Sequence, residues 1–139
     1  MSIREFAVAY AATAVIFLAL DAIWLGTMAE RLYRPAIGHL MRERFAIGPA
    51  VLFYLIYVAG IVVFAIAPAL AERRWQAALA MGALLGLLAY ATYDLTNQAT
   101  LKNWPWRVTL ADLCWGGFAT AVSAAAACRI ALVFAGPPR

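Results

Sequence analysis

The chain has 139 residues, of which 66% are hydrophobic and only 13% are charged, and its formal net charge is +4. Soluble domains average about 25% charged residues, so this composition excludes an ordinary soluble domain. The basic residues stand just outside long apolar runs, where they face lipid headgroups, so we expect membrane lipids and no nucleic acid as partners.

Four long apolar runs, separated by short charged segments, predict a multi-pass membrane protein. A helix needs about 20 residues to cross the roughly 30 Å of hydrocarbon in a bilayer, and each run meets this length. We therefore predict an all-α fold with a single membrane domain over residues 1–139, built as a four-transmembrane-helix bundle. The predicted helices cover residues 6–28, 47–70, 75–98 and 107–134, with an amphipathic interfacial segment at residues 29–46.

The first predicted helix has one face that differs from the others. Its apolar run is longer than the roughly 7–15 residues of a signal-peptide core, so we expect a membrane helix rather than a cleaved signal. Five residues at three-four spacing share the face that we expect to point into the bundle: Tyr10, Ala14, Phe17, Asp21 and Trp24. The segment 29–46 then mixes charged and apolar residues, which is typical of a helix that lies among lipid headgroups.

Two tyrosines on the second predicted helix allow two interpretations. Tyr54 and Tyr57 share a helical face. Tyrosines near a membrane surface commonly belong to the aromatic belt. Tyr54, however, follows Ile47 by about 10 Å of helical rise, which is deeper than a belt requires. The alternative is that at least one of the two hydroxyls points into a polar interior.

The third and fourth predicted helices carry small residues suited to close packing. Gly82 and Gly86 form a G-x-x-x-G pair, which lets a neighbouring helix approach closely, either within one chain or in a homo-oligomer. Tyr90 and Asp94 continue the same four-residue spacing, so this face becomes polar towards its end. The fourth helix is rich in Gly, Ala and Ser, so we expect it to lie at the centre of the bundle.

Three aspartates interrupt the apolar runs, although a carboxylate at the bilayer centre costs roughly 2.5–3.5 kcal/mol. In a four-helix topology Asp21, Asp94 and Asp112 all lie roughly 8–10 Å beneath the same membrane surface. This surface carries the segment 29–46 and the turn at residues 99–106. The shared depth predicts one polar pocket that opens towards this surface.

The first and fourth helices share a second pattern, D-x-x-W followed closely by glycine. Asp21 and Trp24 lie on one face of the first helix, and Asp112 and Trp115 lie on one face of the fourth. Because the two helices run antiparallel, Asp21 could face Trp115 while Asp112 faces Trp24. Each indole N–H could then donate a hydrogen bond to the opposite carboxylate and satisfy a group that is costly to bury alone.

These polar residues have a structural interpretation and a functional one. Aspartates near helix ends also cap backbone, join helices through hydrogen bonds or pair with basic residues, and Lys102 or Arg107 could neutralise one by snorkelling. In the functional interpretation Asp94, Asp112 and Asp21 form a candidate catalytic acid–base cluster. The residues predicted to bind a ligand around them are Asn97, Thr96, Tyr90, Tyr54, Tyr57, Trp24, Trp115 and Lys102.

The cysteines and the histidine argue against a metal site built by this chain. Cys114 and Cys128 lie on the same predicted helix, about 21 Å apart by helical rise, so they cannot form a disulfide with each other. His39 is the only histidine. We therefore expect no metal and no cofactor.

The segment ATYDLTNQATLKNWP, together with LDAIWLG, ADLCWGG and FYLIYVAGIVVF, closely resembles a bacterial membrane-protein family catalogued as domain of unknown function 2177. The resemblance covers nearly the whole chain and implies a small four-helix protein of the bacterial inner membrane. Genes of this family often neighbour lipid-modifying enzymes of the cyclopropane-synthase type. The resemblance therefore favours lipid chemistry with such enzymes as partners, and it brings no mapped active site.

Three functions fit these residues. The first is a protein that binds or modifies a lipid or another hydrophobic small molecule in the carboxylate pocket. The second is a non-catalytic membrane subunit or assembly factor whose aspartates only fix the bundle. The third is a proton-coupled small transporter that acts as an oligomer, although the opposite halves of the helices are almost purely apolar. The sequence leaves open whether the chain is an enzyme, and basic residues flank both membrane surfaces too evenly to orient it.

Overall fold

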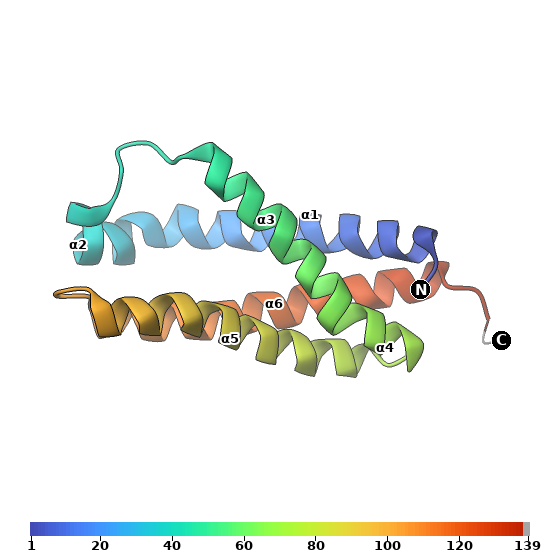
Figure 1. Cartoon of the computed structure of the whole chain (residues 1–139). Coiled ribbons are helices and arrows are strands. Elements are labelled where there is room, and N and C mark those ends of the chain that lie inside the picture. The colour runs from blue at the N-terminus through green and yellow to red at the C-terminus, as the bar shows by residue number, and fades with distance from the viewer. Residues whose placement is uncertain (138–139) are drawn as a thin grey trace.

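The computed structural model describes residues 1–137, which form helices and connecting loops without a strand. The long helices are α1 at Ile3–Met28, α3 at Ile47–Ile61, α5 at Trp75–Thr100 and α6 at Trp106–Phe134. Two short helices are α2 at Arg34–Ile37 and α4 at Ala67–Ala71 (Figure 1). Pro138 and Arg139, the end of the predicted domain, lie outside the described residues.

Four helical segments are long and apolar enough to cross a membrane, which confirms the predicted four-helix membrane fold. They are Ile3–Leu40, Ile47–Ala71, Trp75–Thr100 and Trp106–Phe134. The last three segments begin and end close to the bounds predicted from the apolar runs, whereas the first extends well beyond residue 28. The N-terminus and the last turn of α6 lie at the same end of the bundle (Figure 1), as an even number of spans requires.

The predicted interfacial segment begins as a continuation of α1. Ala29–Tyr33 forms a π-helical turn, α2 follows without a break, and Gly38–Leu40 adds a 3-10 turn. The continuous helical segment has 38 residues. It is therefore about 57 Å long, whereas the hydrocarbon core of a bilayer is roughly 30 Å thick. The last turns of this segment consequently reach the headgroup layer.

Each π-helical turn comes shortly before a proline. Ala29–Tyr33 precedes Pro35, and Val62–Ile66 precedes Pro68. Proline has no backbone N–H, and its ring clashes with the carbonyl of the preceding turn, so an α-helix cannot continue through it undisturbed. The wider π turn accommodates this disturbance, and the helix continues as α2 and α4, in which Pro35 and Pro68 are the second residues.

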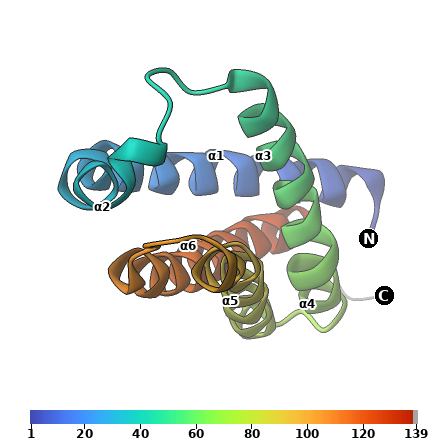
Figure 2. The ribbon, with the colours of Figure 1, turned by 60° about the vertical axis from the view of Figure 1, so that its left-hand side comes forward.

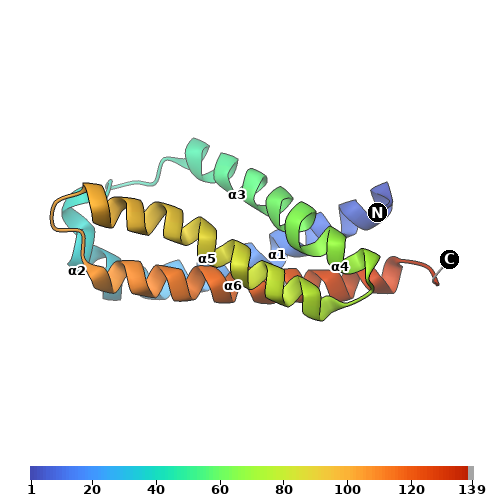
Figure 3. The same cartoon turned by 60° about the horizontal axis from the view of Figure 1, so that its bottom comes forward.

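The most extensive helix contact joins α5 and α6, which run side by side in opposite directions (Figures 1 and 3). Glycines on both helices allow this approach. A Cβ on Gly82 would come within 2.9 Å of the Ala124 Cβ and of the Thr120 carbonyl oxygen. A Cβ on Gly86 would overlap the carbonyl group of Gly116. The G-x-x-x-G face therefore packs within the chain, which is one of the two alternatives that the sequence leaves open.

Helix α6 lies at the centre of the bundle, as predicted. It packs against α5 on one side and against α1 on the other. Its small residues are buried at these contacts: Gly116, Ala119, Ala124, Ala127 and Ala131. The predicted inner face of α1 also points into the bundle, with Phe17 and Asp21 buried. Small side chains on α6 thus bring both neighbours close, because dispersion contacts drive packing in a membrane.

Helix α3 crosses the other long helices at an angle, and its first half stands away from them (Figures 1, 2 and 3). The second half is packed, with Tyr57, Val58 and Ile61 buried. The residues before Tyr57 include exposed large apolar side chains: Ile47, Val51, Leu52, Phe53, Leu55 and Ile56. In a membrane protein, lipid chains cover such surfaces at little cost. The bundle therefore widens beside α3 towards the end that carries α2.

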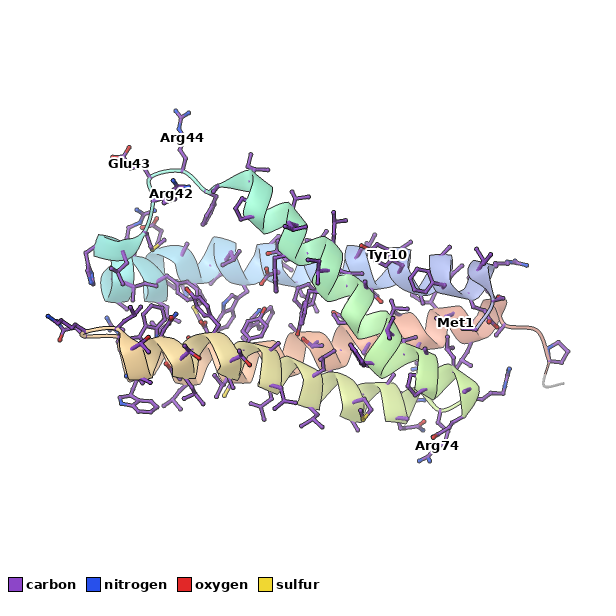
Figure 4. The ribbon with its side chains drawn as sticks, viewed as in Figure 1. Met1, Tyr10, Arg42, Glu43, Arg44 and Arg74 are labelled. Carbon is purple, nitrogen blue, oxygen red and sulfur yellow. The ribbon has the colours of Figure 1, made fainter. Side chains whose placement is uncertain are left out.

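Charged loop residues mark the two ends of the bundle. Arg42, Glu43 and Arg44 lie in the loop at the end that carries α2, and Glu43 and Arg44 point away from the helices (Figure 4). Arg74 lies at the opposite end (Figure 4), in the turn between α4 and α5. Because charged side chains avoid hydrocarbon, their positions place the membrane normal roughly along the bundle.

Candidate functional site

The three aspartates are buried on three different helices. Asp21 lies on α1, Asp94 on α5 and Asp112 on α6, with exposed fractions of 7%, 0% and 7%. Asp21 comes late in α1, Asp94 late in α5 and Asp112 early in α6, so all three occupy the half of the bundle that carries α2. Each buried carboxylate needs a hydrogen-bond donor or a counter-charge.

Asp21 accepts hydrogen bonds from two other helices. The hydroxyl of Tyr54 on α3 donates to one carboxylate oxygen, and the indole N–H of Trp115 on α6 donates to the other at 3.3 Å. One of the two predicted indole–carboxylate bonds is therefore present. The tyrosines of α3 point inwards rather than to an aromatic belt, since Tyr57 bonds the Thr120 hydroxyl at 2.7 Å.

Asp112 reaches the first D-x-x-W motif through an intermediate tyrosine. The indole N–H of Trp24 donates to the hydroxyl of Tyr33 at 2.8 Å, and Tyr33 donates to Asp112. The predicted direct bond from Trp24 to Asp112 is therefore wrong, because the continuation of α1 inserts Tyr33 between them. The rings of Trp24 and Trp115 stack, with centroids 4.6 Å apart and 9° between the planes. The two motifs thus form one antiparallel pair.

Asp94 has no donor, unlike the other two aspartates. Neither of its buried carboxyl oxygens accepts a hydrogen bond from any residue that the structure describes. Its nearest acidic neighbour at the site is Asp112, which lines the same cavity. The ion pairs between described residues are Arg34–Glu30 and Arg74–Glu72, so Asp94 has no salt-bridge partner among residues 1–137.

A cavity of about 270 Å³ lies beside Asp94, between α3, α5 and α6; it is the Asp94 cavity. Its walls are Phe53, Ala89, Tyr90, Tyr93, Asp94 and Asp112. A second cavity of about 210 Å³ lies between the continuation of α1 and the α5–α6 turn, and it shares Tyr93 and Asp112 with the first. Asp21 lines neither cavity, so the structure brings two of the three aspartates to a common cavity.

A family model described as a predicted membrane protein, DUF2177, matches residues 6–129. The chain belongs to the DUF2177 family. The matched range includes Asp21, Asp94 and Asp112 and most of each long helix. Among curated proteins and among solved structures, no match to the chain was found.

The remaining residues predicted to bind a ligand separate into three groups in this DUF2177 chain. Tyr90 lines the Asp94 cavity, whereas the other predicted tyrosines and the two tryptophans bond and stack between helices, as described above. Thr96, Asn97 and Lys102 are absent from the walls of both cavities. Thr96 and Lys102 are exposed and Asn97 is half-buried. The YDLTN block thus contributes its tyrosine and aspartate to the cavity, and its later residues lie outside it.

A closed cycle of hydrogen bonds fixes the turn between α5 and α6 in this DUF2177 chain. The Gln98 amide donates to the Trp104 carbonyl oxygen at 2.7 Å, and the Trp104 indole donates to the Thr109 hydroxyl at 3.1 Å. The Thr109 hydroxyl donates back to Gln98 Oε1 at 2.9 Å. No spacing in the sequence predicts this cycle, which holds the ends of both helices and therefore the spacing of Asp94 and Asp112. Arg107, the other predicted neutralising residue, is exposed.

Three aromatic residues at the site are missing from the sequence prediction: Tyr33, Phe53 and Tyr93. A pattern in the sequence could have predicted the position of Tyr33. It is a repeat of apolar or aromatic residues at every fourth position, which continues past residue 28: Leu25, Ala29, Tyr33, Ile37 and Met41. All five line the second cavity. The π turn has more residues per turn than an α-helix, so it keeps residues at this spacing on one face. Phe53 and Tyr93 carry no comparable sequence signal.

Histidine and cysteine contribute nothing to the two cavities. Within residues 1–137, no group of three or more His, Cys, Asp or Glu side chains is placed to hold a metal ion. His39 and Cys114 are exposed, Cys128 is buried, and both cysteines are free thiols. The site's polar chemistry therefore comes from carboxyl, hydroxyl and indole groups.

Proposed function

We propose that this membrane protein binds a lipid or another hydrophobic small molecule at the Asp94 cavity. The observation that carries the proposal is a fully buried carboxyl group without a donor in the wall of a largely aromatic cavity. A buried polar group left without a partner costs about 1–3 kcal/mol, and more if it is charged. A ligand that donates a hydrogen bond to Asp94 would offset this cost.

Entry from the side, between α3 and α5, suits the exposure of the cavity walls. Phe53 on α3 and Tyr93 on α5 both line the cavity, and they are 47% and 61% exposed. The first half of α3 stands away from the other helices on this side (Figure 2). A volume of about 270 Å³ is just below the roughly 300–1,000 Å³ of common ligand pockets. The cavity therefore suits a small molecule or one part of a lipid.

The presence of Asp94 and Asp112 in one cavity wall extends the proposal from binding to modification. A carboxyl group beside a bound molecule can act as a general acid or base, and a second carboxyl group nearby can exchange a proton with it. In this proposal Asp94 faces the ligand, and Asp112 is held in place by Tyr33. Binding comes first whether or not a reaction follows.

Photo-crosslinking in lipid nanodiscs tests the proposal, with a phospholipid that carries a diazirine in its acyl chain. We expect cross-links to concentrate at Phe53 and at residues 89–94. Ala89→Leu adds bulk inside the cavity, and it should lower this labelling by about tenfold, because overpacking costs about 1–3 kcal/mol. Ala80→Leu makes the same change on an exposed side of α5 and should not alter labelling. Equal labelling in both variants, or cross-links spread evenly over all four helices, would refute the proposal.

A structural role as a non-catalytic subunit or assembly factor is the second candidate. It is favoured by Asp21 and Asp112, whose partners Tyr54, Trp115 and Tyr33 come from different helical segments and join the bundle. Replacement of all three aspartates by asparagine distinguishes the candidates. The structural role is favoured if this triple variant folds and behaves as wild type and if the wild-type protein shows no photo-crosslinking at the Asp94 cavity.

A further inference from the structure

The wall of the Asp94 cavity contains two acidic side chains, Asp94 and Asp112, and no basic one. Asp112 receives its hydrogen bond from Tyr33, which is a neutral donor. Neither of these two aspartates has a salt-bridge partner among residues 1–137. Asp94 adds a fully buried carboxyl group whose oxygens lack any donor in the described part of the chain. The site is thus rich in acceptors and short of positive charge.

Aromatic rings surround this carboxyl group. Phe53, Tyr90 and Tyr93 form the cavity wall together with Asp94. The negative faces of aromatic rings attract organic cations, and a carboxylate adds a full negative charge to the same site. An anionic ligand group would be repelled there, and a purely apolar one would leave the oxygens of Asp94 unpaired.

We propose that the ligand of the Asp94 cavity carries a protonated amine on an apolar body, and that its N–H groups donate to Asp94. This inference rests on the proposed function, because it names the chemistry of the ligand that the same cavity binds. A primary ammonium suits the cavity better than a quaternary one, since the orphan oxygens need N–H donors and a quaternary nitrogen has none. The ammonium would also offset the repulsion between Asp94 and Asp112, which line the same cavity.

Two sources can supply this ammonium chemistry. A free hydrophobic amine brings one charged group and an apolar chain. The ethanolamine headgroup of a phospholipid brings the same primary ammonium with a phosphate beside it. Both can reach the cavity from the bilayer beside α3, so the experiment has an arm for each source.

Native mass spectrometry of the purified protein in a non-ionic detergent tests the inference with four probes of equal chain length. The probes are dodecylamine, dodecyltrimethylammonium, dodecanol and laurate. We expect dodecylamine to bind about tenfold more tightly than dodecanol, because a charge-assisted hydrogen bond is roughly twice as strong as a neutral one. Dodecyltrimethylammonium should bind more weakly than dodecylamine, and laurate should bind most weakly.

Substitution of the carboxyl group tests the role of Asp94 directly. Asp94→Asn keeps the side-chain size and should reduce the preference for dodecylamine over dodecanol from about tenfold to nearly none. Glu43→Gln makes the same charge change on the exposed loop at residues 41–46, and it should leave the preference intact. The wild-type comparison of the four probes decides the inference even if Asp94→Asn does not fold.

The outcomes separate the inference from the proposed function. Equal affinity for dodecylamine and dodecanol, with both lowered by Ala89→Leu, would overturn the amine inference and leave hydrophobic binding at the cavity. A proton shared between Asp94 and Asp112, without any amine, predicts this result. If Ala89→Leu affects no probe, the proposed function fails as well. Displacement of dodecylamine by phosphatidylethanolamine supports the lipid source, and displacement only by other amines supports the free amine.

Discussion

At the scale of single residues, the stacked tryptophans and their carboxylate partners connect the first and last spans. Trp115 does two things at once, because its ring stacks on Trp24 and its N–H donates to Asp21. Hydrogen bonds between membrane helices contribute about 0.6 kcal/mol on average and at most about 1.7 kcal/mol. Loss of the Trp115 N–H would also remove a donor from a buried oxygen of Asp21. The hydrogen bond between Trp115 and Asp21 therefore stabilises the bundle by more than its length suggests.

The change Trp115→Phe removes the indole N–H and keeps an aromatic ring. We expect it to lower the free energy of unfolding by about 1 kcal/mol, because Asp21 loses a donor. Trp115→Ala should cost more, since aromatic pairs contribute about 0.5–1.5 kcal/mol beyond the area that they bury. Unfolding in mixed micelles with increasing dodecyl sulfate measures both values.

Trp106→Phe is the matched control for this comparison. Trp106 is 57% exposed, and no hydrogen bond from its indole to another described residue is present. The substitution should change the unfolding free energy by less than about 0.5 kcal/mol. If Trp115→Phe is equally harmless, the bond to Asp21 does not stabilise the bundle.

At the scale of elements, the contact between α5 and α6 sets the geometry of the site. Asp94 and Asp112 lie near the ends of this helix pair that meet at the turn containing Trp104. The glycines bring the two backbones together, and the Gln98–Trp104–Thr109 cycle closes the turn. The separation of the two carboxyl groups therefore follows from backbone packing.

The change Gly86→Ala should force α5 and α6 apart. Its new Cβ would overlap the backbone carbonyl of Gly116, which cannot move as a flexible side chain could. We expect a loss of about 1–3 kcal/mol in the free energy of unfolding, as for other overpacked contacts. Thermal unfolding and the micelle titration both measure this loss.

Gly60→Ala is the control, because a Cβ at that position of α3 meets nothing within 4 Å. It should be neutral or stabilise the protein by up to about 1 kcal/mol, since alanine favours a helix over glycine. An equal effect of the two substitutions would mean that close approach at Gly86 is not required.

At the scale of the whole molecule, the structure assigns each loop to one end of the bundle. The segment 41–46 and the turn at residues 101–105 lie at the end that carries α2 (Figure 1), and Arg74 lies at the other (Figure 4). With the membrane normal along the bundle, these loops occupy opposite surfaces. The aspartates are buried beneath the surface that carries α2.

Cysteine labelling tests this topology in a chain whose native Cys114 and Cys128 are replaced by alanine. A membrane-impermeant maleimide added to spheroplasts should label Arg42→Cys and Lys102→Cys together. Arg74→Cys should remain unlabelled, because residue 74 lies at the opposite membrane surface. If Arg74→Cys is the variant that is labelled, the other two should remain unlabelled. Disruption of the membrane should make all three cysteines reactive. If Arg42→Cys and Lys102→Cys differ, the four-span arrangement is wrong.

The sequence by itself determined the number of membrane helices and the residues on their inner faces. Apolar length and three-four spacing decide these features because a helix satisfies its own backbone in lipid, without help from the rest of the fold. The inward face of α1, the central position of α6 and the Trp115–Asp21 bond follow from such local patterns. The grouping of the aspartates at one end also follows, since helical rise sets depth.

Only the tertiary structure decided which partner each aspartate receives. The insertion of Tyr33 depends on a π turn, and the open side of the bundle depends on the crossing angle of α3. Neither is encoded by the spacing within one helix, because both depend on how separate helices rotate and cross. For the same reason, Asp21 and Asp112 acquire donors from neighbouring helices, and Asp94 is left without one beside a cavity.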